Sequence, residues 1–394
     1  MAIDYQVVVA GGGPVGSFVA ENLARQGVKT LLLERRGNDT PPICTGIIGV
    51  EVERLISVPP EAVYSEVKSV SLTVAFQRQL EYSSHSTLAY VVNRQVFDRR
   101  MLERALTSGA ELLHASLKGA QFHPPGLVEL EVSQGEARQT ITTRLLVLAT
   151  GYSPLLLERL GMEGYPGTTQ GAQVEVSVPT NRDTIEVYFS NRVVPKGFLW
   201  VVPLGEETAR VGLVTPNGGV ELLREALEKG FLNERVKEFQ PERIRMRPLP
   251  RGPIPRSYAN GILAVGEAAG QLKATTYGGI YYGLLCGQCA VNTALTALNL
   301  ERSSQEVLAT YETQWRAKIG EELSQGARWR NLFESMSDEQ MVIAADIVGG
   351  DGIFNKVKSA VKFDWHKDVI GLGLSLLRRH GLGVVHNSMP GRER

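Results

Sequence analysis

The stretch VVVAGGGPVGSFVAENLARQGVKTLLLER, residues 7–35, decides the fold. Its apolar start predicts a buried parallel strand, and Gly11, Gly13 and Gly16 give the spacing G-x-G-x-x-G. In that pattern the first glycine allows a tight turn and the second lets backbone approach a pyrophosphate, while the third lets the next helix pack closely on the strand. We therefore expect a Rossmann-like strand–turn–helix unit whose helix points its N-terminus at phosphates.

Glu34 follows the expected second strand, residues 30–33. A carboxylate at this position accepts hydrogen bonds from both ribose hydroxyls and repels a 2′-phosphate, so NADP is disfavoured. Two further glycine-rich segments follow at residues 145–161 and 261–283. The three segments together indicate a dinucleotide and favour FAD over NAD.

The third glycine-rich segment has a logic of its own. Residues 262–265 predict a buried strand that ends at a turn containing Glu267, where an acid can bind the ribityl chain of FAD. Gly279 then opens a long helix, expected over residues 280–298, whose N-terminus would stabilise negative charge on the flavin pyrimidine ring. A strand–turn–helix joint without a ligand is the alternative.

Composition narrows the class of protein. A chain of 394 residues is long enough for two domains with an ample core. Lys plus Arg and Asp plus Glu are both 42, so the net charge is zero and no nucleic-acid surface is expected. The three cysteines make no disulfide framework, and no signal peptide is expected, which together favour a cytoplasmic protein. No metal site is expected, because the six histidines lack ligand spacing and the C-x-x-C at Cys286 lies inside the long helix.

Periodicity along the chain predicts three regions, and the fold class is α/β with an added antiparallel sheet. A discontinuous Rossmann-like FAD-binding domain is expected from residues 1–66, 93–168 and 250–300. Residues 67–92 and 169–249 alternate apolar and polar side chains, which predicts an antiparallel-sheet substrate domain. Residues 301–394 predict a helical C-terminal region.

With these motifs the chain resembles the geranylgeranyl reductase family of flavoproteins, within the group that has the para-hydroxybenzoate hydroxylase fold. The resemblance covers about residues 4–320. Beyond the first and third glycine-rich segments, it rests on Cys44-Thr45-Gly46, VVNRQVFDRRMLERA (residues 91–105), GFLWVVPLGEETARVGL (residues 197–213) and Tyr311-x-x-x-Trp315. The family's sheet motif, Y-x-W-x-F-P followed by G-x-G, reads here as Phe198-x-Trp200-x-Val202-Pro203 followed by Gly212-x-Val214.

The resemblance implies an FAD-dependent reductase that hydrogenates the C=C bonds of an isoprenoid. That isoprenoid is a geranylgeranyl lipid, geranylgeranyl diphosphate or a prenyl-quinone side chain. Besides the three glycines and Glu34, the implied FAD contacts are Val15, Arg35, Cys44, Gly46, Arg94, Leu117, Glu267, Gly279 and Ile280. The implied substrate contacts are Phe198, Trp200 and Tyr277.

Cys44 is the implied catalytic residue, because its loop lies over the flavin in this fold. It would donate a proton to the alkene or position a developing cation, and the alternative is contact with FAD alone. As a proton donor its thiol must stay protonated, which an apolar setting would favour. For Arg94 the alternative to a cofactor contact is a surface ion pair with Asp98.

Flavin-dependent monooxygenases and halogenases share this fold and remain alternatives. The Asp-Gly motif of aromatic hydroxylases reads Thr150-Gly151 here, so its Asp is missing. The halogenase motif W-x-W-x-I-P is close to the sequence around Trp200, but halogenases also need a catalytic lysine beside the flavin tunnel. Lys68 is the nearest candidate by position, and its alternating strand predicts that it faces solvent.

Partners are expected on two sides of the reaction. The substrate is a hydrophobic isoprenoid, and electrons come from an external ferredoxin, quinol or NAD(P)H. The apolar residues 369–377, followed by Arg378 and Arg379, predict peripheral contact with an anionic membrane. A helix that caps the substrate tunnel or packs at a dimer interface is the alternative, and no stretch is long enough to span a bilayer.

Overall fold

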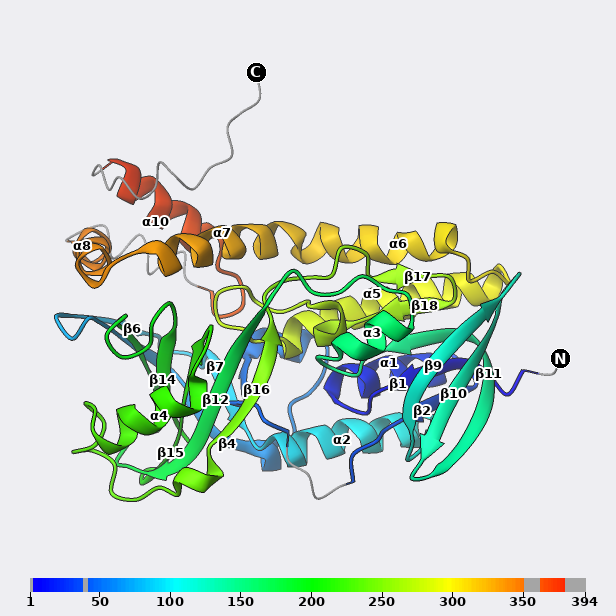
Figure 1. The fold of residues 1–394 in the computed structure, drawn as a ribbon, viewed down its shortest axis with the longest axis horizontal. Helices are drawn as coiled ribbons and strands as arrows, with labels where there is room; N and C mark the ends of the chain where they lie inside the picture. The colour runs from blue at the N-terminus through cyan, green and yellow to red at the C-terminus, as the bar shows by residue number, and fades with distance from the viewer. Residues whose placement is uncertain (1–2, 38–41, 351–361, 380–394) are drawn as a thin grey trace.

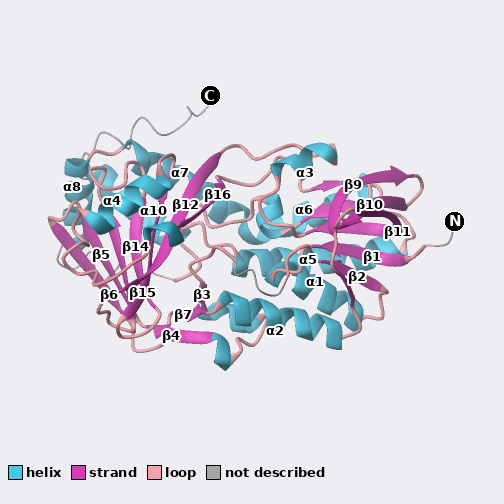
Figure 2. Ribbon diagram, turned by 60° about the horizontal axis from the view of Figure 1, so that its bottom comes forward, coloured by secondary structure: helices cyan, strands magenta, loops and turns pink. Residues whose placement is uncertain are grey.

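The computed structural model describes residues 3–37, 42–350 and 362–379. Two strand-rich lobes lie at opposite ends of the molecule (Figure 1). Figure 2 shows helices α1 (Pro14–Arg25), α2 (Arg94–Thr107) and α5 (Ile280–Asn299) between the strands of the two lobes.

The first lobe holds the glycine-rich motif on a sheet with a parallel centre. β1 (Tyr5–Ala10) lies between β2 (Thr30–Leu33) and β11 (Ala137–Leu148), and β11 also pairs with β18 (Ile262–Ala264), all in parallel. Alternate residues of β1 enter different cores: Val7 packs with α1, α2 and α5, whereas Val8 packs on the opposite face. The prediction of a buried parallel strand at residues 7–10 is confirmed, because this apolar run is buried on both faces of the sheet.

A β-hairpin that the sequence does not predict covers the second face of this sheet. It consists of β9 (Ser116–His123) and β10 (Leu127–Gln134), and it continues in an antiparallel pairing with β11. The sequence of residues 112–117 predicts one strand of this domain, and that prediction is wrong: β8 (Glu111–Leu113) ends at Leu113 and the hairpin begins at Ser116. The short helix α3 (Pro154–Arg159) lies on the same side, where its Leu157 joins the core with β10.

The second lobe is built on a sheet whose described strands follow the order β16-β12-β15-β14-β13-β5-β6. Their bounds are Ser69–Val74 (β5), Arg78–Ser83 (β6), Thr168–Ser177 (β12), Thr184–Phe189 (β13), Phe198–Pro203 (β14), Thr208–Thr215 (β15) and Arg245–Pro250 (β16). The expectation of a purely antiparallel sheet is wrong at one place, because β5 and β13 pair in parallel. These two strands are separated by an excursion through the first lobe, so no hairpin fixes their direction.

A small sheet joins the lobes and corrects a second expectation. β3 (Ile47–Gly49), β7 (Ala89–Val92) and β4 (Val63–Val67) form it, so the alternating residues 80–92 divide between β6 and β7 in different sheets. The sequence also predicts a short helix near residues 51–56, and the structure has a 3-10 turn there, Val50–Arg54.

The last C-terminal helices roof the second sheet. α6 (Gln305–Trp315), a π-helical turn (Arg316–Gly320) and α7 (Glu321–Ser335) run on from one another, and α10 (Lys367–Arg379) packs against both α7 and α8 (Asp338–Gly349). α6 itself packs on α5 and on β17 (Tyr258–Ala259) in the first lobe. Apolar side chains of α7, α8 and α10 share a core with Val74 and Leu80, while α4 (Gly219–Glu228) covers the opposite face of the second sheet. Among the described residues, no helix is both long and apolar enough to cross a membrane.

Candidate active site

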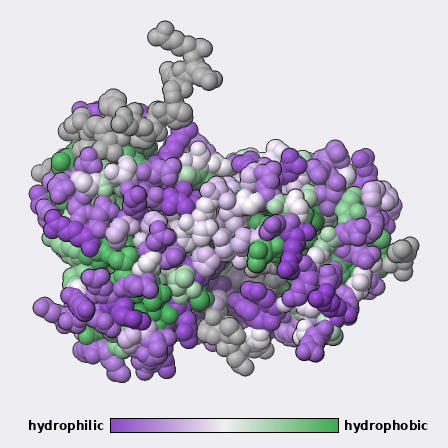
Figure 3. Space-filling view, in the orientation of Figure 1, coloured by the Kyte–Doolittle hydropathy of each residue, from purple (hydrophilic) through white to green (hydrophobic). Residues whose placement is uncertain are grey.

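A cavity of about 1340 Å³ lies between the two lobes. It exceeds the roughly 300–1,000 Å³ of an ordinary ligand pocket, so it has room for a cofactor and a second molecule. One end is lined by the glycine-rich segments, and the other by the apolar faces of β5, β13 and β14 under α7 and α8. Hydrophobic side chains also reach the surface of this second lobe (green, left half of Figure 3).

The turn before α1 has the backbone geometry that a pyrophosphate site requires. Gly11 adopts φ +111°, and a Cβ there would lie 2.3 Å from the carbonyl oxygen of Ala149. A Cβ on Gly16 would lie 1.8 Å from the carbonyl oxygen of Gly11, so only glycine lets the helix pack this closely. The N-cap, Gly13, provides no side-chain cap, and no acid occupies the first turn of α1. The N-terminal N–H groups are thus free to bind an anion.

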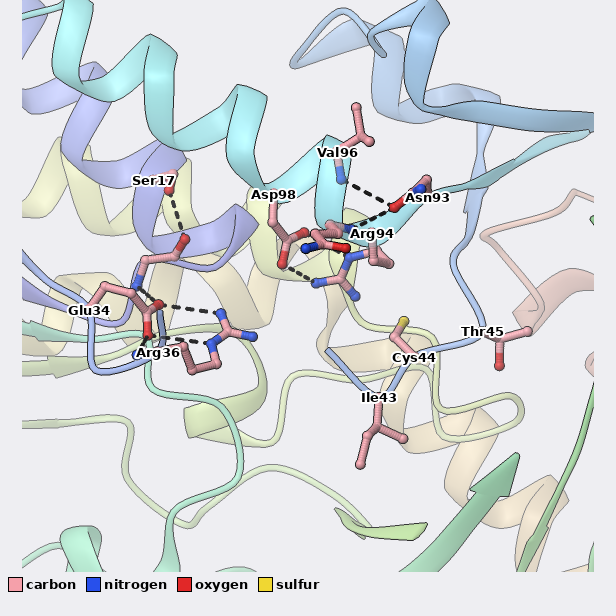
Figure 4. A network of polar contacts seen from close by, with 12 residues as sticks. Ser17, Glu34, Arg36, Ile43, Cys44, Thr45, Asn93, Arg94, Val96 and Asp98 are labelled. Atoms are coloured by element: carbon pink, nitrogen blue, oxygen red, sulfur yellow. Dashed lines mark hydrogen bonds and ion pairs between the residues drawn. The ribbon is translucent and has the colours of Figure 1, made fainter. Parts of the chain in front are cut away.

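Glu34 lies at the tip of β2, where its carboxylate is held in place (Figure 4). Its Oε2 accepts a hydrogen bond of 2.8 Å from the Gly12 N–H, and Oε1 accepts one of 2.7 Å from the Arg36 N–H. Burial raises the pKa of Glu34, but Arg36 and the Gly12 N–H together lower it by more than burial raises it, so the pKa is below its ordinary value. The ion-pair partner is Arg36 rather than the neighbouring Arg35, which lines the cavity with an exposed side chain.

Glu267 meets an arginine that the sequence does not single out. It forms an ion pair with Arg247 of β16, and its Oε1 accepts a 3.0 Å hydrogen bond from the Tyr152 N–H. Burial lowers the pKa of Arg247, and the nearby Arg94 and Arg36 lower it further. Only the fold brings Arg247 here, since β16 belongs to the sheet of the other lobe.

A second free helix N-terminus faces the same cavity. Gly279 is the N-cap of α5, with no side-chain cap and no acid in the first turn. A Cβ on Gly279 would lie 2.1 Å from Cδ2 of Leu272, so a larger residue there would have to displace the Leu272 side chain. Tyr277, two residues earlier, has a positive φ of +58°, a strained conformation that proteins retain mainly at functional sites.

Cys44 lies in the loop before β3, and Figure 4 shows its sulfur turned toward Arg94. Burial raises the pKa of this thiol, but Arg94, the Gly46 N–H and Arg247 lower it more, so the pKa falls below its ordinary value. The apolar setting that a proton donor would need is therefore not what the fold provides. Arg94 also forms the expected pair with Asp98, at 2.8 and 2.9 Å, but this pair is largely buried rather than on the surface.

The second lobe fixes the Cys44 loop from the other side. Arg210 of β15 donates hydrogen bonds to the carbonyl oxygens of Thr45, at 2.7 Å, and of Cys44, at 3.3 Å. Gly46 adopts φ +84° and its carbonyl accepts a 2.8 Å hydrogen bond from the Val92 N–H. A charged residue inside the buried strand TARVGLVT is the sequence signal that could have identified Arg210.

The comparisons with known proteins agree with this geometry. A digeranylgeranylglycerophospholipid reductase of Methanocaldococcus jannaschii is 31% identical over 361 residues, which cover 89% of this chain and 92% of that protein. The chain belongs to the geranylgeranyl reductase family. It is an FAD-dependent oxidoreductase. A second such reductase, from Methanothermobacter thermautotrophicus, is 30% identical to this family member over 86% of the chain and 90% of the relative.

The wider fold group of this family member includes halogenases. The tryptophan halogenase family model matches residues 61–322. A geranylgeranyl bacteriochlorophyll reductase-like protein from Thermoplasma acidophilum has a TM-score of 0.84 at 20% identity, covering 97% of this chain and 98% of that one. A flavin-dependent brominase has a TM-score of 0.74 at 13% identity, covering 96% and 99%. These identities show the shared fold, and the reductase relatives are the closer in sequence.

In this geranylgeranyl reductase family member, the cavity brings together all of the predicted site residues except Gly16, which lies behind the phosphate turn. Phe198 and Trp200 line the apolar end with ring centroids 5.8 Å apart, and Tyr277 lines the region between. The Trp200 ring packs on Gly212, where a Cβ would lie 2.5 Å from Cζ2. Lys68 is exposed and does not line the cavity, in agreement with a solvent-facing role.

Proposed function

We propose that this protein uses FAD to hydrogenate C=C bonds of an isoprenoid lipid. The supporting observation is the continuity of one cavity, which runs from the phosphate turn to an apolar channel between the second sheet and its helical roof. Such a channel suits a long hydrocarbon chain, because burial of apolar surface stabilises it by about 0.8 kcal/mol for each CH₂.

The residues present fit FAD along the length of the cofactor. Glu34 would bind the adenosine ribose, the N-terminus of α1 the pyrophosphate, and the N-terminus of α5 the pyrimidine ring. Glu267 would approach the ribityl chain from its ion pair with Arg247. When bound and reduced, FAD supplies a hydride to one carbon of the alkene.

The apolar end of the cavity would hold the alkene and exclude water. β5 and β13 contribute aliphatic side chains such as Leu72 and Val187, and Phe198 and Phe333 close the channel from β14 and α7. An isolated trisubstituted alkene accepts a hydride poorly unless positive charge develops at the receiving carbon. A proton that solvent ultimately supplies, added to the neighbouring carbon, creates that charge, so that one hydride and one proton are consumed for each bond reduced.

We assign Cys44 to stabilising this positive charge rather than to donating the proton. The environment of Cys44 lowers its pKa, which favours the thiolate. The backbone of the loop that carries it is held by Arg210 and by β7, and Cys44 lines the cavity.

The direct test is an anaerobic reaction followed by product analysis. The FAD-loaded protein is reduced chemically, mixed with a geranylgeranyl substrate, and the lipid is examined by mass spectrometry. We expect two hydrogen atoms to be added for each bond reduced. A hydroxylated or halogenated product that forms only with oxygen would instead favour a monooxygenase or a halogenase.

Two finer parts of the proposal concern partners. The external electron donor is a ferredoxin, quinol or NAD(P)H. For the C-terminal region we favour the tunnel cap over membrane contact, because Ile370 and Leu377 of α10 are buried and Val369 lines the cavity. Residues 380–394 lie outside the described residues. A truncation after Asp368 should leave liposome binding unchanged, and a loss of liposome binding would restore the membrane alternative.

A further inference from the structure

Positive charge is concentrated along the cavity of a chain whose net charge is zero. Within the described residues, the cavity lining includes ten Lys or Arg side chains but only three carboxylates, all of them Glu. Two of these cations form ion pairs with carboxylates at the expected FAD site: Arg36 pairs with Glu34, and Arg247 pairs with Glu267. Two other lining cations, Arg330 and Lys196, lie beside the apolar side chains of the second lobe.

At the apolar end, one carboxylate is shared by two arginines where α7 meets the segment after β16. Glu334 forms ion pairs with two guanidinium groups, that of Arg251 at 2.6 Å and that of Arg330 at 3.8 Å. Arg330 also donates a 2.6 Å hydrogen bond to the Arg251 carbonyl oxygen. Its side chain is only 11% exposed, and its Nε is buried with no hydrogen-bond partner among the described residues. A buried donor of this kind costs free energy unless a ligand accepts from it.

Lys196 adds a second cation from the opposite wall. It lies in the loop before β14, with φ +54°, and its backbone N–H donates a 2.9 Å hydrogen bond to Oδ1 of Asn191. The next residue, Gly197, sits so close to the Val214 carbonyl oxygen that a Cβ would be 1.8 Å away, which fixes the path of the loop. In residues 3–37, 42–350 and 362–379, no carboxylate lies within ion-pair distance of Lys196.

Apolar side chains begin directly beside both cations. Trp329 and Phe333 flank Arg330 on α7, and Phe198 follows Lys196 by two residues; all three line the cavity. This part of the cavity is therefore amphipathic, with cations directly beside aromatic rings. A molecule with an anionic head and a hydrocarbon tail matches this order.

We propose that Arg330 and Lys196 bind the anionic phosphate-type head group of the substrate, while its isoprenoid chain enters the apolar channel. This inference rests on the proposed function. The site differs from the expected pyrophosphate site of FAD, which is built from the N-terminus of α1 and Arg36 on the first lobe. A phosphate monoester, a diphosphate and a phosphodiester share the chemistry that Arg330 and Lys196 would recognise.

The test compares two ligands that differ only in the phosphate, geranylgeranyl monophosphate and geranylgeraniol. Binding to the FAD-loaded protein is followed by quenching of tryptophan fluorescence, since Trp200 and Trp329 line the cavity. Turnover of both ligands is measured separately, as anaerobic oxidation of the reduced flavin.

Arg330→Gln should weaken binding of the monophosphate by roughly 10- to 100-fold, the loss expected for a charge-assisted hydrogen bond. Lys196→Gln should weaken it by about 2- to 5-fold, because that side chain is exposed. Binding of geranylgeraniol should not change in either variant. Arg328→Gln on the same helix is the matched control, since Arg328 is exposed and does not line the cavity.

Equal weakening of both ligands by Arg330→Gln would overturn the inference, because it would mean lost packing rather than lost recognition of an anion. Equal affinity of the natural protein for the two ligands would overturn it as well. If Arg330→Gln does not fold, Lys196→Gln provides the test: weaker binding of the monophosphate alone supports the inference, and equal weakening of both ligands overturns it. Turnover of both ligands without phosphate preference keeps the proposed function and removes the anion site. Phosphate-dependent binding without hydrogenation would keep the anion site and remove the proposed function.

Discussion

Removing the positive charge beside Cys44 should raise the pKa of its thiol. Arg94 lowers this pKa more than any other group, against the raising effect of burial. A single Arg94→Gln variant would leave the buried Asp98 carboxylate unpaired, at a cost of about 3–5 kcal/mol in stability. The double variant Arg94→Gln/Asp98→Asn replaces both charges by amides and avoids that cost.

The size of the change follows from the environment of the sulfur. A cation in close proximity shifts a pKa by roughly 1–3 units, and each unit corresponds to about 1.4 kcal/mol. In the double variant the raising effect of burial on the Cys44 pKa is opposed by fewer charges, since Arg247 is then the main remaining cation. We expect the pKa of Cys44 to rise in the double variant relative to the natural protein.

Alkylation by iodoacetamide as a function of pH measures this pKa, because only the thiolate reacts. Cys286 and Cys289 are buried and burial raises the pKa of both thiols, so Cys44 should be the cysteine that reacts first. The alkylation profile should start below the ordinary thiol pKa and move to higher pH in the double variant. Arg94→Lys keeps the charge and should leave the profile near its original position. A double variant whose profile does not move would refute the assignment of Arg94, and with it the thiolate role of Cys44.

Three further predictions concern other parts of the molecule. Gly16→Ala places a Cβ 1.8 Å from backbone and should reduce the FAD content of the purified protein, whereas Gly205→Ala, where a Cβ would meet nothing within 4 Å, should not. Ala345→Phe fills the channel beneath α8 and should raise the KM for a geranylgeranyl substrate while sparing a geranyl one; Ile343→Phe on the exposed face of α8 is its control. Lys273→Met leaves the buried Asp364 without its 2.7 Å partner and should lower the free energy of unfolding in urea by about 3–5 kcal/mol, and Lys273→Met/Asp364→Leu should recover much of that loss.

The parts of the site that follow from backbone geometry could be predicted from the sequence. Gly11 and Gly16 are required by a turn and a close contact within one strand–turn–helix unit, so their spacing alone identifies them. Arg36 is also a local feature that was missed. It lies two residues after Glu34, and the period of two in extended chain places their side chains on the same side.

Contacts between distant segments could not be predicted in the same way. Arg247 reaches Glu267 from another sheet. Arg94, the first residue of α2, interacts with Cys44 in the loop before β3. Nothing in the spacing of these residues records that proximity. The apolar setting that would favour Cys44 as a proton donor is therefore absent, because the fold places guanidinium groups beside the sulfur.

The strands show the same division between local and distant information. The alternation of residues identified most strands of the second sheet but not their partners, and the parallel pairing of β5 with β13 depends on the route between them. The β9–β10 hairpin was missed because only part of its alternation is apolar, with side chains mostly half-buried along β9.

One measurement tests the central claim, that a single cavity delivers hydride from FAD to an isoprenoid alkene. The reduced, FAD-loaded protein is mixed with geranylgeranyl monophosphate in the absence of oxygen, and the visible absorbance of the flavin is followed alongside the amount of saturated product. We predict that flavin oxidation and alkene reduction proceed at the same rate and in equal amounts. Flavin that stays reduced until oxygen is admitted, with the alkene unchanged, would contradict the account.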